Sequence, residues 1–193
     1  MDLRKHFETA WNLTLKFIIP LMLMTLAMAV VGFISLGILM PVTMAGYMQS
    51  LLLLIRDGRE PRVRDLFSHM EMFLPMLGFG IVVSAIIFIS FMFFFLPGVI
   101  ATAVIIFCCL YMMPLMTDRN LGLIESIKES IALSRCVELT DHMAVVIIFM
   151  AISMIGRLSF FGMLLTMPLA TLFLLSTYKE RIKADQPAAP QQP

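Results

Sequence analysis

Histidine, cysteine and acidic side chains are the first candidates for chemistry in this sequence of 193 residues. Acid–base or metal-assisted hydrolysis requires several such groups within reach of one another. His69 lies two positions from Glu71, and His142 directly follows Asp141, so neither pair shares a helical face. We therefore interpret His6, His69 and His142 as interfacial polar residues. We expect no catalytic residue, no metal site and no cofactor, and hence no enzyme.

The cysteines do not form a redox or metal motif. Cys108 and Cys109 are adjacent within an apolar run, and Cys136 stands alone. Small apolar residues of a helix explain the adjacent pair. The sequence also lacks a phosphate-binding loop and a Gly-x-Ser-x-Gly motif. The 19 methionines could offer thioether ligands for metal export, but flexible packing against other helices is the interpretation we prefer.

Transport is the alternative chemistry. Ion-coupled carriers keep ionisable groups inside their apolar segments, whereas here Gln49 is the strongest polar group at such a position. Gln49 could line a polar pathway or form a hydrogen bond across a helix interface. Arg157, beside Gly156, either reaches lipid phosphates at the outer surface or guards an outer site for an anion. Both alternatives remain open for each residue.

The elements that must position these residues are apolar helices. Hydrophobic residues make up 60% of the chain and charged residues only 14%, against about 25% charged residues in a soluble domain. No charged residue occurs between Glu71 and Asp118. One helix of that length would exceed a hydrocarbon core of about 30 Å, so two spans are expected there.

The sequence predicts an all-α polytopic membrane protein with about six transmembrane helices in three hairpins. Pro41 would begin the second span, Pro97 and Gly98 would form the turn between the middle spans, and the last turn would lie at Gly156–Arg157. These residues are the predicted structural turns. The expected spans are 17–39, 41–55, 73–96, 98–117, 141–156 and 158–178.

Charge supports this arrangement. With a cytoplasmic N-terminus, six spans place all of the 14 lysines and arginines except Arg157 on the cytoplasmic side. Both termini are then cytoplasmic. The small residues Ala27 and Ala29 resemble a signal-peptide cleavage site, but the apolar run continues to Met40, so we expect an uncleaved first span.

Three cytoplasmic segments have helical periodicity. Leu3, Phe7, Trp11 and Leu15 define an apolar face that we expect at the inner leaflet. Similar spacing occurs at 63–74, and at 123–131 an apolar stripe lies opposite charged residues. We expect a single integral membrane domain at 1–178 and a disordered cytoplasmic tail at 179–193, which is rich in Pro and Gln.

Four segments together resemble a family of bacterial integral membrane proteins grouped as a domain of unknown function. That family is related to the membrane domain attached to some glycerophosphodiester phosphodiesterases. The segments are MPVTMAGYMQSLLLLIRDG with Pro41 and Gly46, VRDLFSHM, FLPGVI and LGLIESIKESIALSR. The resemblance covers about residues 30–178. It implies a six-helix fold in the bacterial inner membrane and supplies no catalytic residue.

Taken together, these features predict a non-catalytic inner-membrane protein that acts as a structural or accessory subunit or in envelope maintenance. The alternative is a small transporter or channel subunit. The expected partners are the lipid bilayer and either another membrane protein or further copies of this chain, and no nucleic acid is expected.

The sidedness of the polar segments can be tested directly. In a cysteine-free variant, single cysteines at Asp57 and Asn120 should be protected from an impermeant thiol reagent added to intact spheroplasts, because both would lie inside. Disruption of the membrane should expose both to the reagent. Labelling of either residue from outside would contradict the six-span arrangement.

Overall fold

The computed structural model describes residues 3–135, 139–157 and 160–185, and these ranges contain helices and no β-strand. The all-α prediction is confirmed. Two 3-10 helices lie between α3 and α4, namely η1 (Val63–Phe67) and η2 (Met70–Met72). The α-helices are α1 (Leu3–Lys16), α2 (Ile18–Ile34), α3 (Met40–Asp57), α4 (Phe73–Phe93), α5 (Phe95–Cys109), α6 (Met112–Arg119), α7 (Leu123–Arg135), α8 (Leu139–Arg157) and α9 (Phe160–Asp185).

Several helical stretches are suited to a bilayer. Val63–Phe93 and Phe95–Arg119 are each long and apolar enough to cross a membrane. The number rises to four at most if two bent pairs each count as one span, one of them α1 with α2, which meet at 88°. The chain is therefore an all-α polytopic membrane protein, and the count of six spans remains a prediction.

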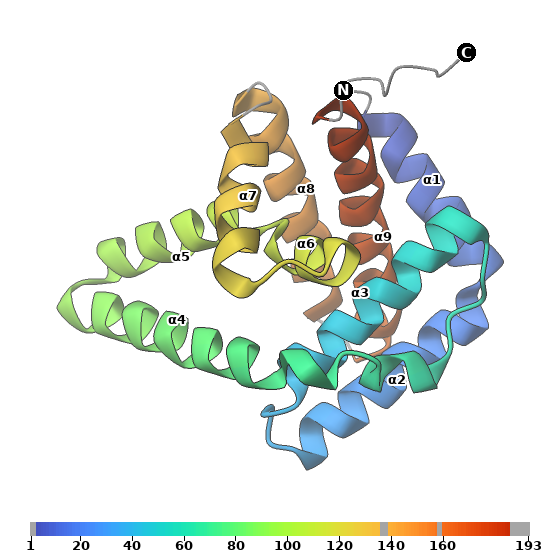
Figure 1. Ribbon diagram of the computed structural model, residues 1–193, viewed down its shortest axis with the longest axis horizontal. Coiled ribbons are helices and arrows are strands. Elements are labelled where there is room, and N and C mark those ends of the chain that lie inside the picture. Colours follow the sequence, from blue (N-terminus) through green and yellow to red (C-terminus); the bar gives the residue numbers. More distant parts are fainter. Residues whose placement is uncertain (1–2, 136–138, 158–159, 186–193) are drawn as a thin grey trace.

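The helices pair along the chain and diverge from a shared polar region. α8 packs along α9, and α4 along α5. In Figure 1 the α4–α5 hairpin extends to the left, away from α8 and α9, while the α2–α3 turn lies at the bottom left. Ion pairs join the end of α3 to α6, and α1 to α9, as described below. The apolar ends thus point away from a common charged base.

The core is centred on α3 and α9. Its largest fully buried side chains include Tyr47 of α3, Phe173 of α9 and Leu21 of α2. Within this core the hydroxyl groups of Tyr47 and Thr25 are hydrogen-bonded at 3.0 Å. A second cluster joins η2 and α4 to α6 through four buried methionines, Met72, Met76, Met112 and Met116. These four side chains pack against one another and fill space, as the preferred interpretation of the methionines expected.

The first turn precedes Pro41 rather than including it. Residues 35–39 reverse the chain, and Leu36 (φ 50°) and Gly37 (φ 83°) adopt the left-handed conformation there. Pro41 lies in the first turn of α3. At that position a missing N–H removes no intrahelical hydrogen bond. Pro41 therefore begins a helix, as predicted, but the turn itself is earlier.

The prediction that Pro97 and Gly98 form the turn of the middle hairpin is wrong. The chain reverses at Phe94, whose backbone is extended, and Pro97 and Gly98 lie in the first turn of α5. Proline is tolerated in the first helical turn, so its presence does not mark the reversal. Gly98 is buried because the ring of Phe91 lies 2.5 Å from the place that a Cβ would occupy. Its role is close packing within the hairpin.

The predicted span at 98–117 is divided into two helices. α5 ends at Cys109, and α6 begins at Met112. Pro114 lacks the N–H that would bond to the carbonyl of Leu110, which accounts for a break at this point. The predicted helix at 63–74 is also divided, into η1, η2 and the start of α4.

Close contact with α3 explains the irregular backbone at 63–72. A Cβ on Gly46 would lie 2.3 Å from the carbonyl oxygen of Asp65 and 2.6 Å from that of Leu66. The side chain of Leu66 is fully buried, and Ser50 donates a hydrogen bond of 2.9 Å to Asp65. The segment is therefore fixed to α3 by packing instead of forming a free amphipathic helix.

The two remaining amphipathic helices exist, but their buried faces are polar. In α1 the buried residues are His6, Ala10 and Thr14, while Phe7, Trp11 and Leu15 of the expected apolar face are exposed and Leu3 packs against the core. In α7 the buried face contains Ser126, Ser130 and Ser134, and Ile124 of the predicted apolar stripe is 67% exposed. Exposed apolar residues suit contact with lipid, and α7 in addition packs Leu123 and Ile127 of the predicted stripe against the methionine cluster.

The contact at Gly46 gives a stability prediction. Gly46→Ala should lower the stability of the protein by about 1–3 kcal/mol, because the added methyl group meets backbone atoms that have no room to move. Gly80→Ala is the matched control, since nothing lies within 4 Å of its added Cβ. It should be neutral or slightly stabilising through helix propensity. Thermal unfolding in detergent measures both, and equal stability of the two variants would disprove the tight contact.

Candidate functional site

A run of six polar residues near the end of α9 collects the polar contacts of the fold. The run, 176–181, reads Ser-Thr-Tyr-Lys-Glu-Arg, and we call it with its partners the polar hub. Successive residues of a helix point about 100° apart, so six residues face all directions around the axis. The hub therefore meets α1, α3, α6 and α8 at one level.

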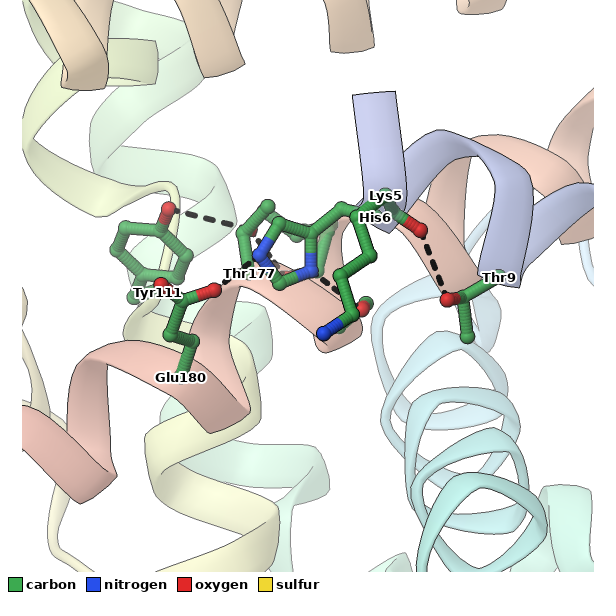
Figure 2. Close-up of polar contacts among 8 residues, drawn as sticks. Lys5, His6, Thr9, Tyr111, Thr177 and Glu180 are labelled. Atoms are coloured by element: carbon green, nitrogen blue, oxygen red, sulfur yellow. Dashed lines mark hydrogen bonds and ion pairs between the residues drawn. The ribbon is translucent and has the colours of Figure 1, made fainter. Parts of the chain in front are cut away.

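α1 is held to the hub by His6. Its Nδ1 lies 2.7 Å from Oγ of Ser176, and its Nε2 contacts the carboxylate of Glu180. Ser176 and Glu180 are four residues apart on α9, so both face α1. Figure 2 shows the His6 ring directed at Glu180, with the contact between Tyr111 and Thr177 beside it. His6 is buried between α1 and α9, and its position at the membrane interface stays a prediction.

The order serine, histidine, carboxylate matches the connectivity of a hydrolytic triad. Such catalysis also needs hydrogen-bond donors placed at the developing oxyanion. Ser176 lies inside α9, where neighbouring backbone N–H groups are engaged in the helix. We therefore interpret this contact as an interhelical link rather than a nucleophilic centre.

Asp118, at the end of α6, is a shared acceptor. Arg56 of α3 pairs with it at 2.7 Å, and the hydroxyl of Tyr178 donates to it at 3.1 Å. Tyr178 is fully buried, and the side chain of Asp118 is only 5% exposed. Lys179 adds a hydrogen bond of 3.4 Å to the carbonyl of Ile55. Together these contacts join α3, α6 and α9.

α8 meets the hub through His142, which is also buried. Nη1 of Arg181 donates to Nδ1 of His142 at 2.7 Å, and Nε2 of His142 donates to the carbonyl of Phe107 at 3.0 Å. A nitrogen that accepts from a guanidinium carries no proton, so this geometry requires a neutral imidazole. The guanidinium also lies over the ring of Tyr111 at 4.9 Å.

Serines of α7 form hydrogen bonds with backbone groups at the end of α5, where the helix breaks. Ser130 donates to the carbonyl of Cys108 at 2.6 Å and accepts from the N–H of Tyr111 at 3.3 Å. Ser134 lies 3.5 Å from the carbonyl of Phe107. Backbone groups freed by the break would be costly if left unpaired in an apolar region. The polar face of α7 therefore pairs the backbone groups that the break between α5 and α6 leaves free, and so lowers the energetic cost of the break.

Some buried polar atoms have no partner in the described part of the chain. They are Nε and Nη2 of Arg181, both ring nitrogens of His69, and Oε1 of Gln49. Gln49, on α3, therefore forms no cross-helix hydrogen bond through this oxygen within those residues. Arg157 ends α8, and its side chain lies outside the described part. The predicted polar pathway and outer anion site stay predictions.

The hub was not predicted from the sequence. The sequence feature that marks the hub is the change from an apolar run at 160–175 to six consecutive polar residues. These six residues were assigned to the end of a span and to a tail. His6 and Glu180 lie 174 residues apart. No spacing rule connects such positions. Within the described residues, no group of three or more His, Cys, Asp or Glu could hold a metal ion.

Comparisons with protein-family models, with curated proteins and with solved structures find no match for this chain.

Removal of the shared acceptor tests the hub. Asp118→Ala should destabilise the protein by about 1–3 kcal/mol, because it leaves the buried Tyr178 hydroxyl unpaired and frees Arg56. The control is Arg4→Ala, which breaks an exposed pair between Arg4 and Glu8 of α1. Exposed pairs of this kind contribute little, so the control should be close to wild type. Thermal unfolding in detergent compares them, and an unchanged midpoint for Asp118→Ala would refute the structural role of the hub.

Proposed function

We propose that the chain is a non-catalytic accessory subunit of a bacterial inner-membrane assembly, to which it contributes the α4–α5 hairpin. The observation that supports this is the exposure of that hairpin. Only 11% of the apolar window of Val63–Phe93 is buried, and Phe88, Met92 and Phe94 are all more than 70% exposed. A bilayer accommodates such a surface, and so does a partner helix.

Small residues distinguish a partner helix from lipid. Helices associate in lipid where Gly, Ala, Ser or Thr lets backbones approach, because apolar exposure alone gives no driving force there. Gly80 and Ser84 lie one turn apart on α4 and line a groove of about 440 Å³ between α4 and the α2–α3 turn. A Cβ on Gly80 would meet nothing within 4 Å. The proposed occupant is an apolar transmembrane helix of another membrane protein.

The proposal includes an orientation. The hub gathers charged residues from α1, α3, α6 and α9 at one end of the fold, and the positive-inside rule assigns that end to the cytoplasm. The resemblance to bacterial inner-membrane proteins agrees with this placement. The second candidate, a transporter subunit, is favoured only by the unpaired Oε1 of Gln49.

Photocrosslinking in cells tests the accessory role. A photoreactive amino acid at Ile81, which is 62% exposed in the groove, should give one defined protein adduct. The same group at Ile19, 79% exposed on α2, should give only lipid adducts. Gly80→Leu should abolish the protein adduct by filling the groove.

Other adducts at Ile81 would decide between the alternatives. A product of twice the mass of 21.8 kDa would identify a homo-oligomer instead of an accessory subunit. Lipid adducts alone at both positions would contradict the proposal.

A further inference from the structure

A basic pocket lies where η1 leads from α3 towards α4. It has a volume of about 490 Å³. Its lining consists of Arg59, Arg62, Arg64, Asp65, Phe67 and Ser68. Asp57, Glu60 and Glu71 are the other acidic residues of this segment, and none of them lines the pocket.

One of the three arginines is neutralised inside the protein. Arg59 donates to Asp65 at 2.9 Å and 3.2 Å, and Ser50 of α3 donates to the same carboxylate at 2.9 Å. Asp65 therefore has its acceptors occupied. Arg62 and Arg64 are exposed, and no hydrogen bond or ion pair of either side chain is found within the described residues. The pocket thus presents two uncompensated guanidinium groups.

Exposed apolar side chains occur in the same segment, and one of them, Phe67, lines the pocket. Val63, Phe67 and Met70 are 37%, 40% and 47% exposed, and the apolar helix α4 begins at Phe73. An arginine pair beside exposed apolar side chains, next to the start of a membrane-spanning stretch, suits the boundary between headgroups and acyl chains. At this depth the anions available to arginine are lipid phosphates.

We propose that this pocket binds the phosphate of an anionic phospholipid, with Arg62 and Arg64 as the phosphate ligands. Guanidinium groups match phosphate oxygens in a two-pronged geometry that lysine cannot reproduce. Val63, Phe67 and Met70 would contact the upper part of the acyl chains. The hydroxyl of Ser68 already donates to the carbonyl of Asp65 at 2.7 Å, so its oxygen is left to accept from a headgroup hydroxyl.

Native mass spectrometry of the full chain in detergent, titrated with phosphatidylglycerol, tests the site. Each basic residue near an anionic membrane surface contributes about fivefold in affinity, so Arg62→Gln/Arg64→Gln should weaken phosphatidylglycerol binding about 25-fold. The matched control, Lys128→Gln/Arg135→Gln, removes the same charge from exposed positions of α7 and should retain wild-type binding. Arg62→Lys/Arg64→Lys should bind with intermediate affinity.

Three results would overturn the proposal. An equal loss of phosphatidylglycerol binding in both double glutamine variants would show a general charge effect. Binding of phosphatidylcholine as tight as that of phosphatidylglycerol would show that the site does not recognise the anionic charge. Displacement of the lipid by inorganic phosphate at equal concentration would identify a soluble anion as the ligand. Thermal unfolding of the double variants confirms that they are folded, since neither arginine supports another described residue.

Discussion

The fold depends on the pairing of polar groups around the end of α9. An unpaired polar group in an apolar surrounding costs several kcal/mol, so each polar residue of the hub requires a partner from another helix. Asp118 meets this requirement for Arg56 and Tyr178 at once. His6 does the same for Ser176 and Glu180. Helix positions at the hub are therefore fixed by directional hydrogen bonds, and apolar packing fills the space between them.

The opposite ends of the hairpins are under no such constraint. Residues near the tip of the α4–α5 hairpin, such as Phe93 and Leu96, are largely exposed, and α4 and α5 mainly contact each other. In lipid this exposure carries little penalty, because lipid tails are as apolar as the side chains. The charged base is held by several directional bonds, whereas the tip of the α4–α5 hairpin is covered by exposed apolar side chains.

This asymmetry explains what could be predicted from the sequence. Composition and the absence of charge between Glu71 and Asp118 were sufficient for the helical membrane class, and periodicity located α1 and α7 within a few residues. The polar faces that both helices bury, with His6 and Thr14 on α1 and the serines on α7, were not predicted. An apolar stripe marks the interior in water, whereas in a membrane protein the interior of a charged base attracts the polar stripe. Ser130 and Ser134 are buried for this reason, and Ile124 is exposed.

The prolines predicted where helices begin, but they did not predict where the chain reverses direction. Pro41 and Pro97 both occupy first helical turns, so proline identified the helices that follow a turn. The reversal at Phe94 had no residue signal, because an extended backbone is open to any residue type. Gly46 and Gly98 were noted as parts of motifs, yet each is set by a tertiary neighbour, a backbone carbonyl in one case and an aromatic ring in the other. Sequence spacing does not encode such neighbours.

Asp65, which lines the basic pocket, plays the same structural role as Asp118 in the hub. Like Asp118, it accepts from an arginine and from a hydroxyl group of another element, and so fixes η1 to α3 while it neutralises Arg59. Since its acceptors are used for this purpose, the charges of Arg62 and Arg64 are left without a counterpart in the described part of the chain. Their guanidinium groups lie exposed a few residues before the apolar helix α4, where another molecule can supply the anion that the chain does not. At the membrane boundary, a lipid phosphate is the anion that is always present.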